Sequence, residues 1–494
     1  MQILWFKQRN LRLQDSEPLF LAMKESRRSG PVLPVFIHEP SIIRQPDMAR
    51  QHQVFTRETL DELADDIGSI GGDLAEYVGE AVEALDSLHR QRAITKIWTH
   101  RETSQNVCFD RDRKVRAWAR DRGISLVEVE QDGIARGSQP KESFPDYFAR
   151  AVQAELRDPM GKDLSERFAS LPVPSCNLAD IPAASGEDKP LRPRGGRRAA
   201  MELMNRFFTI PALQVYPKVL SSPNTAWGQC SRMSTYLATG TVSDREIFQR
   251  VDGLVTQARN QMNDRDFEAF QGKARFYLDR LAWRRNYIQS FEDRPELEHT
   301  PMLAEFKGVR EEVNDDLLER WKNGMTGFAF VDAAMRCLRE TGWLNMRLRG
   351  TVVSFATMNL WQPNWPVAHY LGRELADFHP AVHHVIHQLV AGMTSFDGLM
   401  VYDVVKQGFD HDKDGDFVRR YVPELADLPG GSVHDLSMTG GHLSEDARAQ
   451  GYAPYPFPVV DHKATAKLAK ENVHAIRYGM PLKTLEPEPQ QSLF

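Results

Sequence analysis

The sequence has 494 residues, of which 41% are hydrophobic and 26% charged, so it can bury two or three domain cores. Its formal net charge of −6 excludes a surface that is basic throughout, although a local basic patch is compatible with that charge. The chain has no long apolar run, no signal peptide in the opening MQILWFKQRN, and no disulfide or metal-cluster spacing among its four cysteines, which together predict a cytoplasmic protein without a membrane span.

The N-terminal part of the sequence alternates short apolar runs with helical spacing. Apolar runs rich in β-branched or aromatic residues stand at 2–6, 31–37, 74–78, 95–100 and 125–130. Helical spacing lies between them, at 51–67 and 104–121. This alternation predicts an α/β, Rossmann-like domain with a five-stranded parallel sheet, which binds ligands at the carboxyl ends of its strands. No G-x-G-x-x-G follows the first strand, so the dinucleotide-binding fingerprint is missing.

Residues 136–195 are richer in proline, serine and charge, which is typical of a long connecting segment. At its end, RPRGGRR (192–198) fits either a contact with DNA phosphates or a solvated linker end, and the solvated end is the commoner case. Helical spacing or composition then follows at 196–208, 243–262, 264–292, 314–324, 328–341 and 345–360. We therefore expect an α/β domain (1–135), a linker (136–195), an all-α domain (196–470) and a polar tail (471–494).

The stretch GFDHDKDGDFVRRYVPEL (408–425) begins like a calcium-binding EF-hand loop. Asp410, Asp412 and Asp414 match its first ligand positions, but the twelfth position, where a bidentate glutamate is needed, holds Tyr421. The residues just before it are arginines, which disfavour a divalent cation, and the residues from Tyr421 on have the composition of a loop. The spacing therefore favours a solvated acidic turn over a metal site.

Five stretches together carry a resemblance to a known family. They are LWFKQRNLRLQDSEPL (4–19), CSRMSTYLATGTVS (230–243), LAWRRNY (281–287), TGFAFVDAAMRCLRETGWLNMRLR (326–349) and FDHDKDGDFVRRYVPEL (409–425). In this order and spacing they resemble the DNA photolyase/cryptochrome family over nearly the whole chain. The resemblance implies that the second domain binds FAD, and that the acidic stretch frames the flavin pocket.

The resemblance also implies which residues bind the cofactor. Hydroxyl groups in SRMSTYL would hold the FAD phosphates, whereas serines there also suit a helix N-cap. Arg349 and Asp377 resemble a pair beside the reactive end of the flavin, where a charged pair can tune its redox state. The full predicted set is Tyr216, Ser231, Met233, Ser234, Arg284, Asn345, Arg347, Arg349 and Asp377. The chain departs from the family at Cys230, at Asn345 and at Met346, where threonine, histidine and asparagine are usual.

The residues implied in DNA repair depart further from the family. Trp283 matches a tryptophan that packs against the flipped lesion, although a helical tryptophan is more often a core residue. Arg280 stands where many dimer-repairing photolyases carry a glutamate. The segment AVHHVIHQLVAG (381–392) lacks the usual asparagine and tryptophan beside the flavin. His383 and His387 lie four apart in it, a spacing that suits packed histidines, a metal pair without a third ligand, or a proton-handling role.

The resemblance implies light-driven, FAD-dependent repair of pyrimidine lesions in UV-damaged DNA by a monomeric protein. A cryptochrome-like photoreceptor with little repair is the alternative, and an FAD protein without light chemistry remains open. The sequence leaves the lesion undetermined between a cyclobutane dimer and a (6-4) photoproduct. Arg280 and the histidines favour the (6-4) lesion, whose repair needs a proton donor. The N-terminal domain leaves room for a second, antenna chromophore.

Overall fold

A five-stranded parallel sheet organises the N-terminal part of the molecule. In the computed structural model its strands are β1 (Gln2–Phe6), β2 (Val32–His38), β3 (Ala75–Val78), β4 (Lys96–His100) and β5 (Ser125–Val129). They lie in the spatial order β3-β2-β1-β4-β5, and every neighbouring pair is parallel. The predicted five-stranded parallel sheet is therefore confirmed, with each strand where the apolar runs indicated.

The structure describes residues 1–131, 133–136, 144–158, 163–169, 174–396 and 398–484. Parts of the predicted linker (137–143, 159–162 and 170–173) and the end of the predicted tail (485–494) lie outside the described residues. The α-helices are α1 (Glu17–Ser29), α2 (Pro40–Ile43), α3 (Arg50–Ser69), α4 (Ala81–Gln91), α5 (Asn106–Asp121), α6 (Phe144–Gln153), α7 (Arg197–Phe207), α8 (Ile210–Val219), α9 (Pro223–Gln229), α10 (Ser234–Ala238), α11 (Asp244–Gln261), α12 (Asp264–Asp293), α13 (Asp315–Lys322), α14 (Ala329–Thr341), α15 (Met346–Ser354), α16 (Asn364–Glu374), α17 (Pro380–Val390), α18 (Val404–His411), α19 (Asp416–Tyr421), α20 (Leu436–Thr439), α21 (Glu445–Ala449) and α22 (His462–Arg477). The short helical turns are η1 (Ser165–Arg167), η2 (Leu178–Asp180), η3 (Pro295–Glu298), η4 (Ala304–Phe306), the π-helical η5 (Phe355–Asn359), η6 (Pro423–Leu425) and η7 (Gly430–His434).

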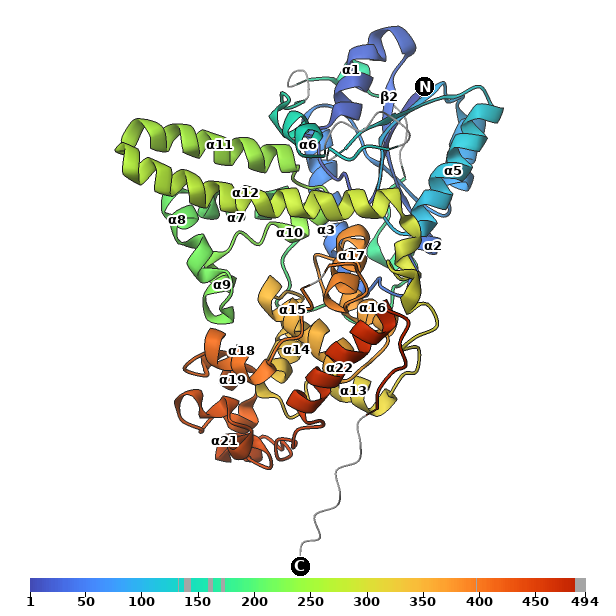
Figure 1. The fold of residues 1–494 in the computed structure, drawn as a ribbon. Helices are drawn as coiled ribbons and strands as arrows, with labels where there is room; N and C mark the ends of the chain where they lie inside the picture. The colour runs from blue at the N-terminus through green and yellow to red at the C-terminus, as the bar shows by residue number, and fades with distance from the viewer. Residues whose placement is uncertain (132, 137–143, 159–162, 170–173, 397, 485–494) are drawn as a thin grey trace, which may run out of the picture. The chain divides into compact units, whose positions relative to one another are not determined.

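Helices cover both faces of the sheet (Figure 1). Because successive strand residues point to opposite faces, Ile3 and Trp5 of β1 pack in one hydrophobic cluster with α4 and α5. Leu4 and Phe6 of the same strand pack in a second cluster with α1 and α3. This double coverage explains why the strands are continuously apolar instead of alternating, as expected for a buried parallel sheet.

The contacts divide the chain into two compact units. The sheet unit comprises Met1–Val219, Gln229–Glu298 and Gly372–His383, and the helical unit comprises Leu220–Gly228, His299–Leu371 and the chain from His384 onward. The domain boundaries expected from composition stay a prediction. Within the described residues, none of the helices combines the length and apolarity that crossing a bilayer requires.

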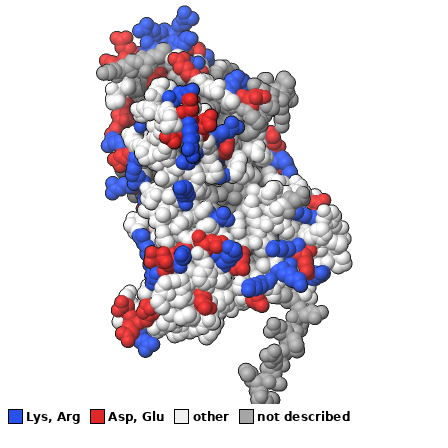
Figure 2. Space-filling model, turned by 60° about the vertical axis from the view of Figure 1, so that its left-hand side comes forward, with Lys and Arg blue, Asp and Glu red and all other residues white. Residues whose placement is uncertain are grey.

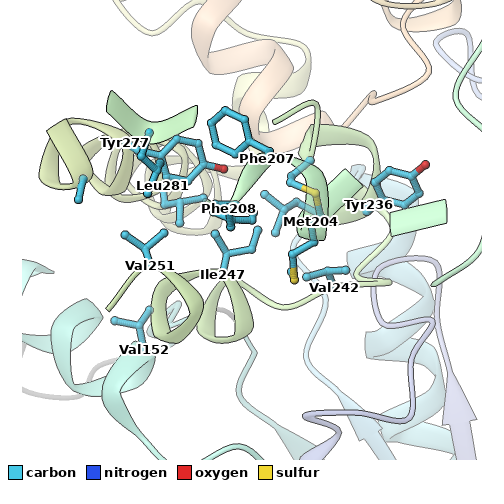
Figure 3. Close-up of a cluster of buried hydrophobic side chains, with 14 of the residues drawn as sticks. Val152, Met204, Phe207, Phe208, Tyr236, Val242, Ile247, Val251, Tyr277 and Leu281 are labelled. Atoms are coloured by element: carbon cyan, nitrogen blue, oxygen red, sulfur yellow. The ribbon is translucent and has the colours of Figure 1, made fainter. Parts of the chain in front are cut away.

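A second core of the sheet unit lies among α6–α8 and α10–α12. Its buried side chains include Phe207, Phe208, Ile247 and Tyr277, which Figure 3 shows gathered between the helices. Helix α11 begins at a capping box, in which Ser243 Oγ accepts a hydrogen bond from Glu246 N and the Glu246 carboxylate accepts one from Ser243 N. The predicted helices at 243–262 and 264–292 are confirmed as α11 and α12, which lie side by side (Figure 1).

The arginine-rich run 192–198 differs from its predicted solvated state. Arg192 donates from both terminal nitrogens to Glu58 of α3 at 2.9 Å, and its side chain is only 5% exposed. Arg197 pairs with Glu246 of α11, while Arg198 reaches Asp65 of α3 and stays exposed. The prediction of a solvated linker end is therefore wrong for Arg192 and Arg197, because carboxylates distant in sequence neutralise them.

The helical unit has a core of its own around α22, in which Met358, Ala391 and Val473 are buried. Arg310 donates to the backbone oxygens of Thr357 at 3.0 Å and of Ala391 at 3.5 Å, and its guanidinium lies 5.1 Å from the centre of the Trp361 ring. The arginine thereby satisfies carbonyl groups at the ends of two helical segments, which helical hydrogen bonds leave unpaired.

Candidate functional site

The serines predicted to hold phosphate lie at the start of α10, in the sheet unit. Ser231 Oγ accepts a hydrogen bond from Tyr277 Oη at 3.2 Å and one from Met233 N at 3.5 Å. Burial raises the pKa of Tyr277, so its hydroxyl stays protonated and donates. Ser234 opens the helix and is partly buried. The hydroxyl of Thr235 beside it is buried and has no hydrogen-bond partner among the described residues, so it is free to bind an added acceptor.

Tyr216 lies on α8 against the same tyrosine. Its ring centre is 5.3 Å from that of Tyr277 and 5.5 Å from that of Phe207. Burial raises its pKa, which keeps the hydroxyl neutral. Tyr277 thus joins two predicted cofactor residues, Tyr216 and Ser231. Sequence reasoning missed Tyr277, whose only signal is that it lies one turn before the LAWRRNY stretch (281–287).

Arg284 of α12 contacts acceptors of its own unit. Its Nη2 donates to Leu237 O of α10 at 2.9 Å, and its Nη1 lies 3.6 Å from Asp244 Oδ2. The neighbouring Arg285 is fully buried and pairs with the same carboxylate. These contacts fix Arg284 beside the segment that carries the predicted phosphate-binding serines, and its contact with a phosphate stays a prediction.

Arg280 and Trp283 form a stack on the exposed side of α12. The Arg280 guanidinium carbon lies 4.2 Å from the ring centre of Phe276 and 4.2 Å from that of Trp283. Trp283 is 53% exposed, so the core position that is commoner for a helical tryptophan does not apply here. The structure therefore brings two predicted catalytic residues into contact, with Phe276 as a third member that the sequence analysis did not single out.

Helix α15 carries the predicted cofactor residues of the helical unit. Asn345 is its N-cap, where Oδ1 accepts from Leu348 N at 2.9 Å and Nδ2 donates to Ser221 O at 3.2 Å. Arg349 Nε donates to Leu344 O at 2.8 Å. Arg347 lies over the ring of Tyr402 at 5.5 Å, and its Nε is buried without a partner among the described residues. Asn345 is thus committed to capping, whereas Arg347 retains a buried donor for an added acceptor.

Asp377 and the predicted histidines lie in and near α17. Asp377 and His383 are buried in the sheet unit, and the His383 ring centre is 5.2 Å from that of Phe378. His387 is buried on the part of α17 that belongs to the helical unit, one turn beyond His383. Arg349 and Asp377 belong to different units, so their predicted pairing stays a prediction, as do the roles of both histidines.

The acidic run 410–416 is built as a helix cap. Asp412 is buried, and its carboxylate accepts hydrogen bonds from Phe417 N and Val418 N, each at 3.0 Å, and from Asn224 Nδ2 at 2.7 Å. Asp410 pairs with Lys406, while the Asp414 side chain is exposed. Helix α19 follows and includes Tyr421, with the turn η6 after it, so the loop expected from Tyr421 onward is wrong. The expected solvated acidic turn is therefore wrong for Asp412, because its carboxylate is buried and accepts backbone hydrogen bonds.

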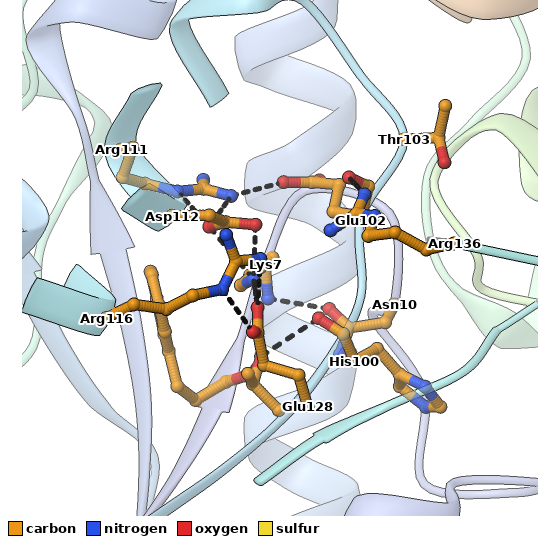
Figure 4. A network of polar contacts seen from close by, with 12 residues as sticks. Lys7, Asn10, His100, Glu102, Thr103, Arg111, Asp112, Arg116, Glu128 and Arg136 are labelled. Carbon is orange, nitrogen blue, oxygen red and sulfur yellow. Dashed lines mark hydrogen bonds and ion pairs between the residues drawn. The ribbon is translucent and has the colours of Figure 1, made fainter. Parts of the chain in front are cut away.

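At the carboxyl ends of β1 and β4, charged residues fill the crevice where parallel sheets bind ligands (Figure 4). Lys7 donates to Asp112 at 3.0 Å, and Arg111 donates to Glu39 at 2.9 Å and to Glu102 at 2.6 Å. Burial would raise the pKa of Asp112, but the cations of Arg111 and Lys7 outweigh it and lower that pKa to about 2. A second, antenna chromophore in this domain stays a prediction.

The charged side chains on one face of the molecule are of both signs and interspersed (Figure 2). This mixture agrees with the net charge of −6. Recognition of an anionic partner on that face would therefore depend on individual cations and not on a continuous basic field.

Comparison with known proteins covers most of the chain. Residues 2–150 match the family model described as DNA photolyase, and residues 277–475 match the model described as FAD binding domain of DNA photolyase. The deoxyribodipyrimidine photo-lyase of Halobacterium salinarum is 25% identical over 94% of this chain and 96% of its own length. Cryptochrome DASH of Gloeobacter violaceus is 26% identical over 97% of this chain and 98% of its own. A class III photolyase structure from Agrobacterium tumefaciens covers 97% of this chain and 98% of its own with a TM-score of 0.76 at 23% identity, which shows a shared fold.

Proposed function

Because the chain belongs to the DNA photolyase/cryptochrome family, we propose that it is an FAD-dependent photolyase that uses blue light to repair pyrimidine lesions in DNA. The observation that carries the proposal is the match of residues 277–475 to the FAD-binding domain of DNA photolyase. That match includes Trp283, Arg284, the Asn345–Arg349 segment and Asp377. A relative named deoxyribodipyrimidine photo-lyase aligns with nearly the whole chain, which supports repair over other flavin chemistry.

The donor groups fit a cofactor that carries phosphates. Thr235 Oγ1 in the sheet unit and Arg347 Nε in the helical unit are buried donors without partners among the described residues, an arrangement that costs free energy unless a ligand supplies an acceptor. Ser231 and Ser234 add hydroxyls next to Thr235. Asp377 and Arg349 would hold the flavin end, as the family resemblance implies. When bound and reduced, FAD supplies the photoexcited electron for the repair chemistry.

The protein's own residues would bind the lesion and handle protons. Trp283 offers an exposed ring on which an extruded base can stack. Arg280 is a permanent cation that donates hydrogen bonds and accepts none, so it suits an oxygen of the lesion or its phosphate. His383 and His387 would hold or release a proton at an imidazole nitrogen, which the repair of a (6-4) lesion requires and that of a cyclobutane dimer does not.

The decisive experiment is illuminated repair by the purified, pre-reduced protein. Two oligonucleotides, one with a single cyclobutane dimer and one with a single (6-4) lesion, are irradiated with blue light and assayed for restored pyrimidines, with a dark control. We expect light-dependent repair of one lesion, and His383→Ala and His387→Ala should impair it if that lesion is the (6-4) photoproduct. Colourless protein that cannot be reconstituted with FAD would refute the proposal.

A light-sensing role is the second candidate, favoured by the full-length similarity to a protein named cryptochrome DASH. Such a photoreceptor would bind FAD and respond to light without restoring either lesion. The same experiment separates the two functions, because FAD binding with no repair of either oligonucleotide supports the photoreceptor.

A further inference from the structure

After α22 the chain turns back along that helix before the described residues end. The buried side chain of Asn472 donates from Nδ2 to Lys483 O at 3.0 Å, and its Oδ1 accepts from Lys483 N at 2.8 Å. Lys483 Nζ also pairs with Glu471 at 2.9 Å, and Met480 N donates to Ala475 O at 2.8 Å. These contacts fix Lys483 to the helical unit, so the residues that follow it start from a defined place on that unit.

The sequence beyond this anchor has a distinct composition. Residues 484–494 read TLEPEPQQSLF, with two glutamates, two prolines and neither lysine nor arginine. An acidic segment of this kind is repelled by DNA phosphates and by an anionic membrane surface. Its prolines cannot donate a backbone hydrogen bond to a helix or a sheet of this chain. The partner that the segment suits is therefore another protein.

An adjacent leucine and phenylalanine stand at only two places in the sequence. Leu19 and Phe20 belong to α1, where Leu19 is 1% exposed and packs in the core of the sheet unit. Leu493 and Phe494 instead follow the acidic prolines, without the helical spacing of apolar residues that would build a core-facing helix. Gln490 stands three positions before Leu493, and its amide can both donate and accept hydrogen bonds. The segment thus offers an apolar pair and a polar anchor at a fixed spacing, as short docking peptides do.

We propose that residues 490–494 are a docking peptide through which this protein binds a sliding clamp, the protein ring that encircles DNA during replication. The peptide pocket of such a ring in bacteria has an apolar part that accepts a Leu-Phe pair and, beside it, a polar part that accepts a glutamine amide. Recognition therefore uses Leu493, Phe494 and Gln490 together. The inference goes beyond the proposed repair function and rests on it only in that the protein acts on DNA.

The charge of the molecule gives such a docking peptide a use. The net charge is −6, and cations and anions are interspersed on the face shown in Figure 2, so the general electrostatic attraction of this chain to DNA is weak. A ring that encircles DNA stays on it without any charge from this protein. Binding to the ring raises the effective concentration of the protein at DNA. Residues 485–489, which precede the peptide, span at most about 18 Å, so the protein would stay next to the ring.

The test is binding of the full-length protein, purified with its FAD, to a purified bacterial sliding clamp, measured in the dark by surface plasmon resonance. We expect saturable binding in the absence of DNA. The double substitution Leu493→Ala with Phe494→Ala should weaken it about thirty-fold or more, the effect of truncating the central side chains of an interface, and Gln490→Ala should weaken it about ten-fold. A synthetic peptide of residues 484–494 should compete for the clamp, and the same peptide with both alanines should not.

Leu482→Ala is the matched control, since Leu482 is an apolar side chain that is 47% exposed and lies before the acidic spacer, and it should leave the affinity unchanged. The absence of binding, or an affinity of the double variant within about two-fold of the unsubstituted protein, would overturn the inference. A lower unfolding temperature of the double variant would also overturn it, because Leu493 and Phe494 would then pack on this chain itself. Light-driven repair of a short oligonucleotide is assayed without the clamp, so failure of docking is distinct from failure of the repair function.

Discussion

At the residue scale, the crevice at the carboxyl ends of β1 and β4 shows how burial and charge have opposite effects on the pKa of a carboxyl group. Glu39, Glu102 and Asp112 share the cations of Arg111 and Lys7. Burial raises the pKa of Glu39 to about 6, with Arg111 opposing it and Glu102 adding to it. The Glu39 Oε2 atom is buried and has no partner among the described residues, which agrees with a carboxyl group that is readily protonated.

The raised pKa predicts a pH dependence of stability. A carboxyl whose pKa is higher in the folded state, about 6 against about 4.3 unfolded, favours folding fully below the unfolded value and loses that contribution as the pH rises through 6. Glu39→Gln mimics the protonated form, so relative to the unsubstituted protein it should be more favourable at pH 8 than at pH 5, by about 1.3 kcal/mol. Urea unfolding at both pH values measures this, and an equal effect of the substitution at the two would contradict it.

At the element scale, α19 illustrates how one buried carboxylate can set a helix start. Gly415, directly before the helix, has φ +77°, a left-handed conformation that glycine adopts without strain. The Asp412 carboxylate accepts hydrogen bonds from two backbone N–H groups of the first turn, which would otherwise be unpaired. The residues whose pattern resembles a calcium-binding loop thus form the N-terminal cap of α19.

Removing that cap should destabilise the protein without involving calcium. Asp412→Ala leaves two backbone N–H groups and the Asn224 amide without their acceptor, which should cost about 3 kcal/mol of unfolding free energy. Asp414→Ala is the control, since that side chain is exposed, and it should change stability by less than about 0.5 kcal/mol. Urea unfolding measures both. A rise in unfolding temperature on adding millimolar calcium, lost in Asp414→Ala, would restore the EF-hand interpretation.

At the scale of the whole molecule, the cofactor should couple to folding. Residues predicted to bind FAD come from α8, α10 and α12 in the sheet unit and from α15 in the helical unit. A ligand that binds the folded chain and not the unfolded one stabilises it by mass action.

The protein with bound FAD should therefore unfold at a higher temperature than FAD-stripped protein, and added FAD should restore the difference. With free FAD at about 100 times its dissociation constant, the gain is about 2.7 kcal/mol. Arg347→Ala should reduce this FAD-dependent shift, because its buried Nε would bind an acceptor, whereas Arg339→Ala on the exposed side of α14 should not. Thermal unfolding with and without FAD is the measurement, and identical shifts in both variants would remove Arg347 from the predicted set.

The sequence by itself determined the five strands, the longer helices such as α3, α5, α11 and α12, and the family resemblance. Strand positions follow from apolar runs, and helices α11 and α12 from the helical spacing at 243–262 and 264–292, because both signals are local along the chain. The family resemblance supplied the FAD assignment and the candidate residues. Without it, the chemistry of these residues would have predicted only helix caps and exposed helix positions.

Only the tertiary structure decided which charges are neutralised and which remain available. Arg192 forms an ion pair with Glu58, and Lys7 forms one with Asp112, while Asn224 donates a hydrogen bond to Asp412. The two partners of each pair lie more than 100 residues apart along the chain. No local pattern encodes such pairs, because they form when the whole chain folds and brings distant segments together. The same folding leaves Arg280 without a carboxylate partner among the described residues, whereas Arg259, an arginine of the same unit that also lies over a ring, has one.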